Sequence, residues 1–281
     1  MIQERAFPGR DLGDFRVTAI SDGYLQAGLD LLSNIEADEA SRLQARAGVL
    51  DPTAIHVNCY LIRGRGRTVL VDAGGGGFFQ PRGGALMANL AAAGVSASDI
   101  DTVLLTHAHP DHVGGLLDAS GNKAFPGAEL VVPEQEFAFW QDDANLSRAS
   151  EDARSHFALA RDVFDRYGMQ TRRFRGSEVL PGISAQPLPG HTVGHCGYRI
   201  ESGDQGLLVW GDTVHFPHIQ IVRPDASIAF DQEGLVAAST RSSLLDRVSA
   251  ENLLVAGMHL GEPGFARIVR RARGYELCYE G

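Results

Sequence analysis

The feature that most constrains this chain is a cluster of metal-binding side-chain types at residues 106–112. Three histidines and one aspartate occur in the segment Thr-His-Ala-His-Pro-Asp-His, directly after the apolar run Val103-Leu104-Leu105. Neutral imidazole and carboxylate together suit zinc, and also manganese, iron or cobalt. Four such side chains exceed the three that a single catalytic metal usually takes, so two ions could be held here. A lone histidine is usually structural, but this spacing, followed by Gly114-Gly115, predicts a metal site.

The bulk composition narrows the classes of protein to consider. The chain has 281 residues, of which 44% are hydrophobic, enough for one large domain with a sizeable core. A formal net charge of −10 argues against a nucleic-acid-binding protein, which would carry a basic face. No run approaches 18 apolar residues, so no membrane-spanning helix is expected. The three cysteines imply no disulfide framework, and the first residues lack the apolar stretch of a signal peptide, which predicts a cytoplasmic protein.

Hydrophobic periodicity predicts strands that alternate with helices. Strands are expected at residues 15–20, 56–62, 68–72, 101–105, 129–132, 184–188, 197–201, 207–210 and 252–256. Helices are expected from Pro81 through residues 84–93, and at 133–140, 150–167 and 232–250. No linker or repeat marks a boundary, so residues 1–281 are expected to form a single domain, with 1–50 as an N-terminal arm and first strand. Two mixed β-sheets between helices are the simplest architecture.

A cluster of four ligands predicts further ligands at other strand ends. His191 lies in a glycine-flanked turn, Asp212 follows the apolar strand at 207–210, and His259 ends the segment Gly257-Met258-His259. Alone, each has an ordinary interpretation as a turn histidine, a helix cap or a surface histidine. Their shared position just beyond an apolar strand indicates one site, because loops at strand ends of α/β proteins commonly carry the chemistry.

These segments together resemble the metallo-β-lactamase superfamily. The matching elements are residues 106–112 with Gly114-Gly115, the glycine-flanked His191, the pair Gly211-Asp212, His259 and the segment Val71-Asp72-Ala73-Gly74. They occur in the right order over nearly the whole chain. The resemblance implies an α/β fold, the αβ/βα sandwich of two mixed sheets flanked by helices, with the metals in a groove at one edge. It says much less about the substrate, because the fold hosts many reactions.

The resemblance also implies which residues hold the metals. One metal would be bound by His107, His109 and His191, and the second by Asp111, His112 and His259. Asp212 would bridge both ions, and Asp72 would orient a ligand imidazole from behind. True β-lactamases of the superfamily generally have cysteine at the position of Asp212 and arginine at that of His112, so antibiotic hydrolysis is not favoured.

Two metals a few ångströms apart predict metal-assisted hydrolysis. They can share a bridging hydroxide that attacks at neutral pH, and they can stabilise the charge that develops on a carbonyl or phosphoryl oxygen. Asp212 and Asp111 are the expected catalytic residues. Asp111 is the first candidate for moving a proton to the leaving group, although a purely ligating role fits equally well. Zinc is the expected metal, with manganese, iron and cobalt as alternatives.

Other segments resemble the branch of the superfamily that contains methyl-parathion hydrolase and related lactonases. They are residues 57–62, 70–72, 77–79, 124–126, 139–140 and 259–265. This resemblance implies an aromatic pocket for a small, largely neutral lactone, carboxylic ester or phosphotriester, with Phe79, Trp140 and Phe157 in its wall. Core packing explains these aromatics equally well. His215 could line the same groove, whereas a loop histidine is more often solvated.

Other functions stay open at this point. A glyoxalase-II-like thioester hydrolase shares the ligand set and would need a basic patch, for which the candidates are Arg267, Arg270, Arg271 and Arg273. An iron-dependent sulfur dioxygenase would use one metal, and a metal-binding scaffold would lack turnover. The pair His195-Cys196 is not expected to act as a nucleophile, because adjacent side chains need not face each other. The amphipathic segment 31–47 could form a homodimer contact or a solvated helix.

Overall fold

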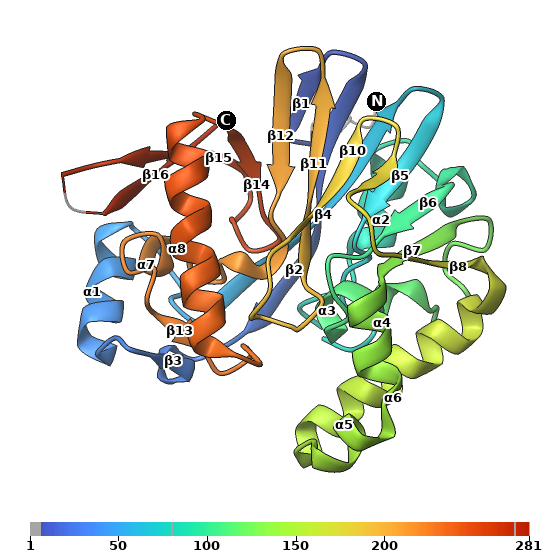
Figure 1. Ribbon diagram of the computed structural model, residues 1–281, viewed down its shortest axis with the longest axis horizontal. Helices are drawn as coiled ribbons and strands as arrows, with labels where there is room; N and C mark the ends of the chain where they lie inside the picture. Colours follow the sequence, from blue (N-terminus) through green and yellow to red (C-terminus); the bar gives the residue numbers. More distant parts are fainter. Residues whose placement is uncertain (1–6, 80, 273, 281) are drawn as a thin grey trace.

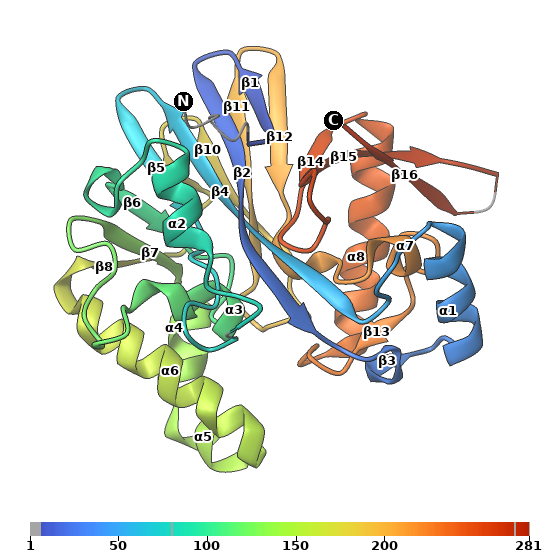
Figure 2. The same cartoon turned by 180° about the vertical axis from the view of Figure 1, so that it is seen from behind.

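Two seven-stranded β-sheets pack face to face, and helices cover their outer faces (Figure 1 and Figure 2). This computed structural model describes residues 7–79, 81–272 and 274–280. Parallel and antiparallel pairs occur in both sheets. The predicted sandwich of two mixed sheets flanked by helices is therefore confirmed.

The first sheet has the strand order β1-β2-β4-β5-β6-β7-β8, and the second has the order β16-β15-β14-β12-β11-β10-β9. The strands of the first are β1 (Gly9–Leu12), β2 (Phe15–Gln26), β4 (Ala54–Gly64), β5 (Arg67–Val71), β6 (Thr102–Leu104), β7 (Glu129–Pro133) and β8 (Thr171–Phe174). Those of the second are β9 (Glu178–Leu180), β10 (Ile183–Pro187), β11 (Cys196–Ser202), β12 (Gln205–Val209), β14 (Leu254–Ala256), β15 (Phe265–Arg270) and β16 (Tyr275–Tyr279). A small separate pair joins β3 (Leu32–Ser33) to β13 (Ser227–Ile228).

The helices complete the outer layers. They are α1 (Ala37–Arg46), α2 (Leu86–Ala92), α3 (Pro110–Val113), α4 (Glu134–Gln141), α5 (Asp143–Arg148), α6 (Glu151–Tyr167), α7 (Pro217–Gln220) and α8 (Gly234–Ala250). Short 3-10 turns lie at Leu29–Leu31, Ala97–Asp99, Gly114–Leu116, Gly168–Gln170 and Gly211–Thr213. No helix within the described ranges is long and apolar enough to cross a membrane.

Successive residues of the central strands point into different apolar layers. On β5, Val69 and Val71 pack between the sheets, whereas Leu70 packs with α2 and α6 on the outer face. On β12, Leu207 lies between the sheets and Leu208 packs against α8. Burial of each such side chain stabilises the fold by about 1.5–3 kcal/mol. Because both faces are covered, these strands have continuous apolar sequences, and they were correctly predicted.

The predicted helix that begins at Pro81 is wrong at its start, because α2 begins at Leu86. Gly84 has a φ of +87°, which a right-handed helix does not allow. The Asp22 carboxylate of β2 accepts hydrogen bonds from the backbone N–H groups of Gly84 at 3.1 Å and Leu86 at 2.9 Å. The Asp22 side chain, which comes from strand β2, therefore caps these N–H groups at the start of α2.

Two other predicted segments differ in length or setting. The strand predicted at 15–20 continues to Gln26, through a bulge between Ser21 and Gly23. The segment 31–47 forms β3 and α1, and its buried residues Leu32 and Ala40 pack in one cluster with Phe216 and Ile219. Its apolar face is thus covered within the chain, and the homodimer contact stays a prediction.

Candidate metal centre

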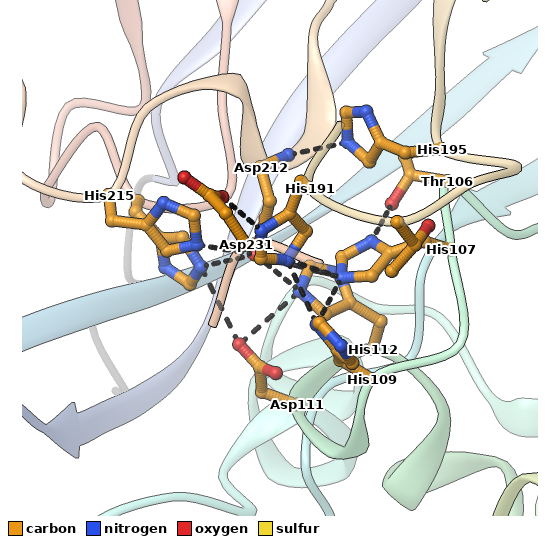
Figure 3. A network of polar contacts seen from close by, with 12 residues as sticks. Thr106, His107, His109, Asp111, His112, His191, His195, Asp212, His215 and Asp231 are labelled. Carbon is orange, nitrogen blue, oxygen red and sulfur yellow. Dashed lines mark hydrogen bonds and ion pairs between the residues drawn. The ribbon is translucent and has the colours of Figure 1, made fainter. Parts of the chain in front are cut away.

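All seven predicted ligands lie together at one edge of the sandwich. Figure 3 labels each of them except His259. The segment after β6 supplies four of them, with His107 and His109 in the loop and Asp111 and His112 on the short helix α3 that follows. The loops after β10, β12 and β14 supply His191, Asp212 and His259, respectively. The first sheet thus contributes four donors and the second sheet three. These seven residues form two clusters with Asp212 between them, and His215 joins His191 and Asp212 in a third, overlapping group of possible ligands among the described residues.

The first cluster is a triangle of three imidazoles. His109 Nδ1 lies 3.1 Å from His107 Nε2 and 2.9 Å from His191 Nε2, and the latter two nitrogens are 3.1 Å apart. This is close to the spacing of about 3.3 Å that tetrahedral ligation with bonds of about 2.0–2.1 Å requires. Three N–H protons would repel one another at this spacing. The ring nitrogens therefore turn lone pairs toward the centre of the triangle. The arrangement fits a divalent metal ion.

The second cluster combines two carboxylates with two imidazoles. Asp212 Oδ2 lies 3.0 Å from His259 Nε2 and 3.2 Å from His112 Nε2. Asp111 Oδ2 lies 3.3 Å and 3.5 Å from the same two nitrogens. This set of hard and borderline donors also fits a divalent ion.

Asp212 also reaches the first cluster. Its Oδ2 lies 3.4 Å from His191 Nε2 and 3.7 Å from His107 Nε2. Its other oxygen, Oδ1, is buried and has no hydrogen-bond partner among the described residues. An unpaired buried carboxylate oxygen is costly, and a bound cation would compensate it.

Hydrogen bonds behind three of the imidazoles fix which ring nitrogen faces the centre. The Nδ1–H groups donate to Asp231 Oδ1 at 2.9 Å from His191, to Asp72 Oδ2 at 2.6 Å from His112, and to the His56 carbonyl at 2.8 Å from His259. In the neutral rings, each Nε2 therefore carries a lone pair that points into the site. Asp72 occupies the place that the resemblance implied.

Asp72 and Asp231 differ in how visible they are in the sequence. Asp72 has a φ of +57°, and the Thr106 backbone N–H and hydroxyl donate to its carboxylate at 2.8 Å and 2.7 Å. Asp72 also ends a predicted strand, and its place at the strand end is the feature that the sequence shows. The positive φ at this position is known only from the structure. Asp231 lies in a polar loop that resembles any surface turn, and it was missed.

A second residue that the sequence did not indicate is Arg241, on α8. Its guanidinium is buried and donates to the carbonyl of Thr213 at 2.7 Å, and its Nη2 lies 3.7 Å from Asp231 Oδ2. Burial lowers the pKa of Arg241 to about 10. Arg241 thus ties the loop that follows Asp212 to the residue behind His191.

The two clusters differ in their protonation equilibria. Burial, with the neighbouring imidazoles, lowers the pKa values of His107 and His109 well below the ordinary value. At His112 burial also opposes the charged form, but the carboxylates of Asp212 and Asp111 raise its pKa well above the ordinary value. Burial would raise the pKa of Asp212, yet His112 and the other imidazoles hold it well below its usual range.

Two further histidines lie beside the clusters. His215 is 3% exposed, stacks on His259 with ring centroids 5.1 Å apart, and has Nε2 3.2 Å from Asp212 Oδ2. The interpretation of His215 as a solvated loop residue is therefore wrong. Burial lowers its pKa to about 4.

His195 has a different setting, in which both ring nitrogens are engaged. Its Nδ1–H donates to the Leu188 carbonyl at 2.7 Å, and its Nε2 accepts from the Asp212 N–H at 2.9 Å. The Cys196 thiol donates to the Leu105 carbonyl instead, at 3.9 Å. The two side chains form no thiol–imidazole pair, as expected.

A cavity of about 670 Å³ opens onto the donors. Its lining includes the four residues predicted to bind substrate, namely Phe79, Trp140, Phe157 and His215. Trp140 and Phe157 also belong to the apolar core, with ring centroids 4.7 Å apart. Trp140 and Phe157 therefore serve both as core residues and as cavity wall, because they lie where the core meets the cavity. Trp140 also packs edge-on against the His109 ring, at 5.8 Å.

A model of the metallo-beta-lactamase superfamily matches residues 52–259, most of the chain. The chain belongs to this superfamily. Within the superfamily, the structure of hydrolase AbOPH is similar over 99% of both chains, with a TM-score of 0.92 and 23% identity. AidC, described as a dizinc quorum-quenching lactonase in complex with the product N-hexanoyl-L-homoserine, is similar over 98% of both chains, with a TM-score of 0.92 and 25% identity.

The protein YobT of Bacillus subtilis (strain 168) is 27% identical over 164 residues, which is 57% of this chain. The chain spans 63% of the length of that relative.

Proposed function

We propose that this superfamily member is a metal-dependent hydrolase of small, neutral ester-like substrates, with lactones and carboxylic esters as first candidates and phosphotriesters as a further one. One observation carries the proposal: seven histidine and aspartate donors converge where an aromatic-lined cavity opens onto them. Fold alone would not indicate this chemistry, because one fold hosts many reactions.

Two divalent ions, with zinc as the first candidate, would occupy the two clusters. When bound, such ions lower the pKa of water and polarise the carbonyl or phosphoryl oxygen of the substrate. His107, His109 and His191 would hold the first ion, and Asp111, His112 and His259 the second. Asp212 would contact both, since its Oδ2 lies within 3.0–3.7 Å of nitrogens in each cluster.

Asp111 is the residue we assign to proton transfer. It is 8% exposed and lines the cavity, whereas its Oδ2 faces His112 and His259. The other carboxylate oxygen is left to take a proton and to deliver it to the departing alkoxide. His215 has its Nε2 3.2 Å from Asp212 Oδ2 and lines the cavity, from where it would contact the substrate.

The cavity walls favour an apolar, uncharged substrate. Phe79, Phe139 and Phe230 join Trp140 and Phe157 in the lining. Arg148 is the only lysine or arginine among the described lining residues, so a polyanionic substrate such as RNA would find little compensating charge. The description of AidC as a dizinc lactonase supports a lactone for this chain.

The thioester alternative receives less support. Arg267, Arg270 and Arg271 pair with Glu280, Asp246 and Glu276, and none of the three lines the cavity. Arg273 lies outside the described residues. A mono-iron sulfur dioxygenase would leave the second donor cluster without a role.

The test is a substrate panel run with metal analysis on the purified protein. We expect two ions per chain and turnover of a neutral lactone, aryl ester or phosphotriester, with little turnover of a glutathione thioester. One iron per chain with oxygen consumption would contradict the proposal. So would failure of the protein with two ions bound to hydrolyse any member of the panel.

A pair of neighbouring phenylalanines tests the cavity. Phe79 lines the cavity, whereas Phe78 does not and is 44% exposed. Phe79→Ala should lower kcat/KM for a hexanoyl ester by about 5- to 30-fold, which corresponds to about 1–2 kcal/mol of lost apolar contact. The acetyl ester should lose less. Phe78→Ala is the matched control, and equal losses in both variants would contradict the assigned wall.

A further inference from the structure

Glu136, on α4, is a fully buried carboxylate outside the donor clusters. Its Oε1 accepts hydrogen bonds from the Ala108 backbone N–H at 2.9 Å and from Trp140 Nε1–H at 2.7 Å. Its Oε2 accepts from the Thr192 hydroxyl at 2.6 Å and from the Gly194 N–H at 3.1 Å. Four donors on one carboxylate satisfy it without a cationic partner.

The four donors come from three places that matter to the site. Ala108 stands between His107 and His109, and Thr192 and Gly194 lie one and three residues after His191. Trp140 lines the cavity. The two carboxylate oxygens of Glu136 thus bind different loops. Oε1 accepts from the loop after β6, and Oε2 accepts from the loop after β10.

The close approach of a glycine gives a second, independent sign of this docking. A Cβ added at Gly194 would lie 2.2 Å from the Glu136 backbone nitrogen and 2.6 Å from its Cα. Only glycine therefore lets the loop that carries His191 lie directly against the start of α4.

The second cluster has different support. Its imidazoles are held from behind by Asp72 and by the carbonyl of His56, and neither residue contacts Glu136 through a hydrogen bond within the described part of the chain. The contacts of Glu136 are thus specific to the three-imidazole cluster.

We propose that Glu136 is a positioning residue that sets the affinity of the first cluster for its metal ion and holds Trp140 in the cavity wall. It touches no substrate, and it acts by keeping His107, His109 and His191 in one triangle while the two loops belong to different sheets. The inference rests on the proposed function only in that the clusters bind metal.

Glu136→Gln is the decisive variant because it keeps the size of the side chain. The amide presents its NH₂ group either to Ala108 and Trp140, or to Thr192 and Gly194. In each orientation at least one backbone N–H loses its acceptor, because an N–H cannot be turned to accept. We expect the affinity for one of the two ions to fall about 10- to 100-fold and the other affinity to stay unchanged. Titration of the metal-free protein with zinc against a competing chelator measures both affinities.

Three further variants separate positioning from general destabilisation. Thr192→Val removes one donor and should weaken the same ion about two- to tenfold. Trp140→Phe keeps the backbone contacts, so it should leave both affinities unchanged and raise KM about two- to fivefold. Ile268→Ala, in a different apolar cluster, should lower the melting temperature without changing either affinity.

The outcomes are distinguishable. Wild-type affinity for both ions in Glu136→Gln, or an equal loss of both, would overturn the proposal. If Glu136→Gln does not fold, Thr192→Val carries the same test, and an unchanged affinity there would overturn it. Failure of the proposed function would be seen separately, as two-ion binding by the wild type without turnover of any ester.

Discussion

The two donor clusters of this site are built on different principles. The first has three imidazoles and no carboxylate of its own, and burial holds the pKa values of two of them, His107 and His109, well below the ordinary value. The second has two carboxylates that compensate a cation directly. A cluster without a carboxylate depends on accurate placement of its lone pairs, and Glu136 and Asp231 provide that placement. The comparison teaches that one metal position relies on preorganisation and the other on charge.

The largest effect should come from the residue that the two clusters share. Asp212→Ala removes the oxygen that lies within 3.0–3.7 Å of nitrogens in both clusters. We expect loss of both ions and at least about a thousandfold loss of kcat/KM, since the ions supply several kcal/mol of transition-state stabilisation. Metal analysis with steady-state kinetics measures this. His218→Ala is a control from the neighbouring half-buried segment. Retention of one tightly bound ion would show that Asp212 serves a single cluster.

The next effect separates the clusters through the carboxylates behind them. Asp231→Asn should weaken only the first ion and Asp72→Asn only the second, each by about 10- to 100-fold. In each variant the amide oxygen can still accept from Nδ1–H, but the NH₂ group then faces the Thr106 or the Ile228 backbone N–H, so the loss combines the missing negative charge with one lost acceptor. A two-site zinc titration measures both affinities. If either variant weakened both ions equally, the division into two clusters would be incorrect.

The smallest effect is on pH dependence in the metal-free protein. The folded pKa values of His107 and His109 lie below the ordinary 6.5, so the folded state binds fewer protons and the free energy of unfolding falls as the pH drops below about 6.5. His112 has a raised folded pKa, so its contribution is complete below about pH 6.5 and is lost as the pH rises through the folded value. Each titrating group contributes a slope of at most about 1.4 kcal/mol per pH unit.

Urea unfolding in the presence of a chelator, from pH 5 to pH 8, checks these signs. His109→Gln should flatten the acid side of the profile, and His112→Gln should flatten the alkaline side. The same change of slope in both variants would contradict the opposite electrostatics of the clusters.

The sequence predicts those parts of the molecule whose signal is local. Four candidate ligands lie within residues 106–112, and the other three follow apolar strands, so the side chains that the structure brings together could be listed from the sequence. Strands buried on both faces, such as β5 and β12, were equally visible. The edge strand β8 was not, because its sequence Thr-Arg-Arg-Phe lacks an apolar pattern.

The unpredicted residues share one property, which is that their role depends on what faces them in space. Glu136 is an acid in the first turn of a helix, a position that is favourable on any protein surface. Arg241 occupies a helix that otherwise resembles an ordinary surface helix. Tertiary packing alone determines that these side chains are buried, and no residue spacing in the sequence predicts their burial.

Each donor cluster takes ligands from loops of both sheets. An ion bound in either cluster would therefore act as a reversible cross-link between the two halves of the sandwich. The free energy of binding would then add to the cohesion of those halves by mass action. Removal of the ions would loosen the molecule along the plane between its sheets, so that metal supply and mechanical integrity would be coupled in one chain.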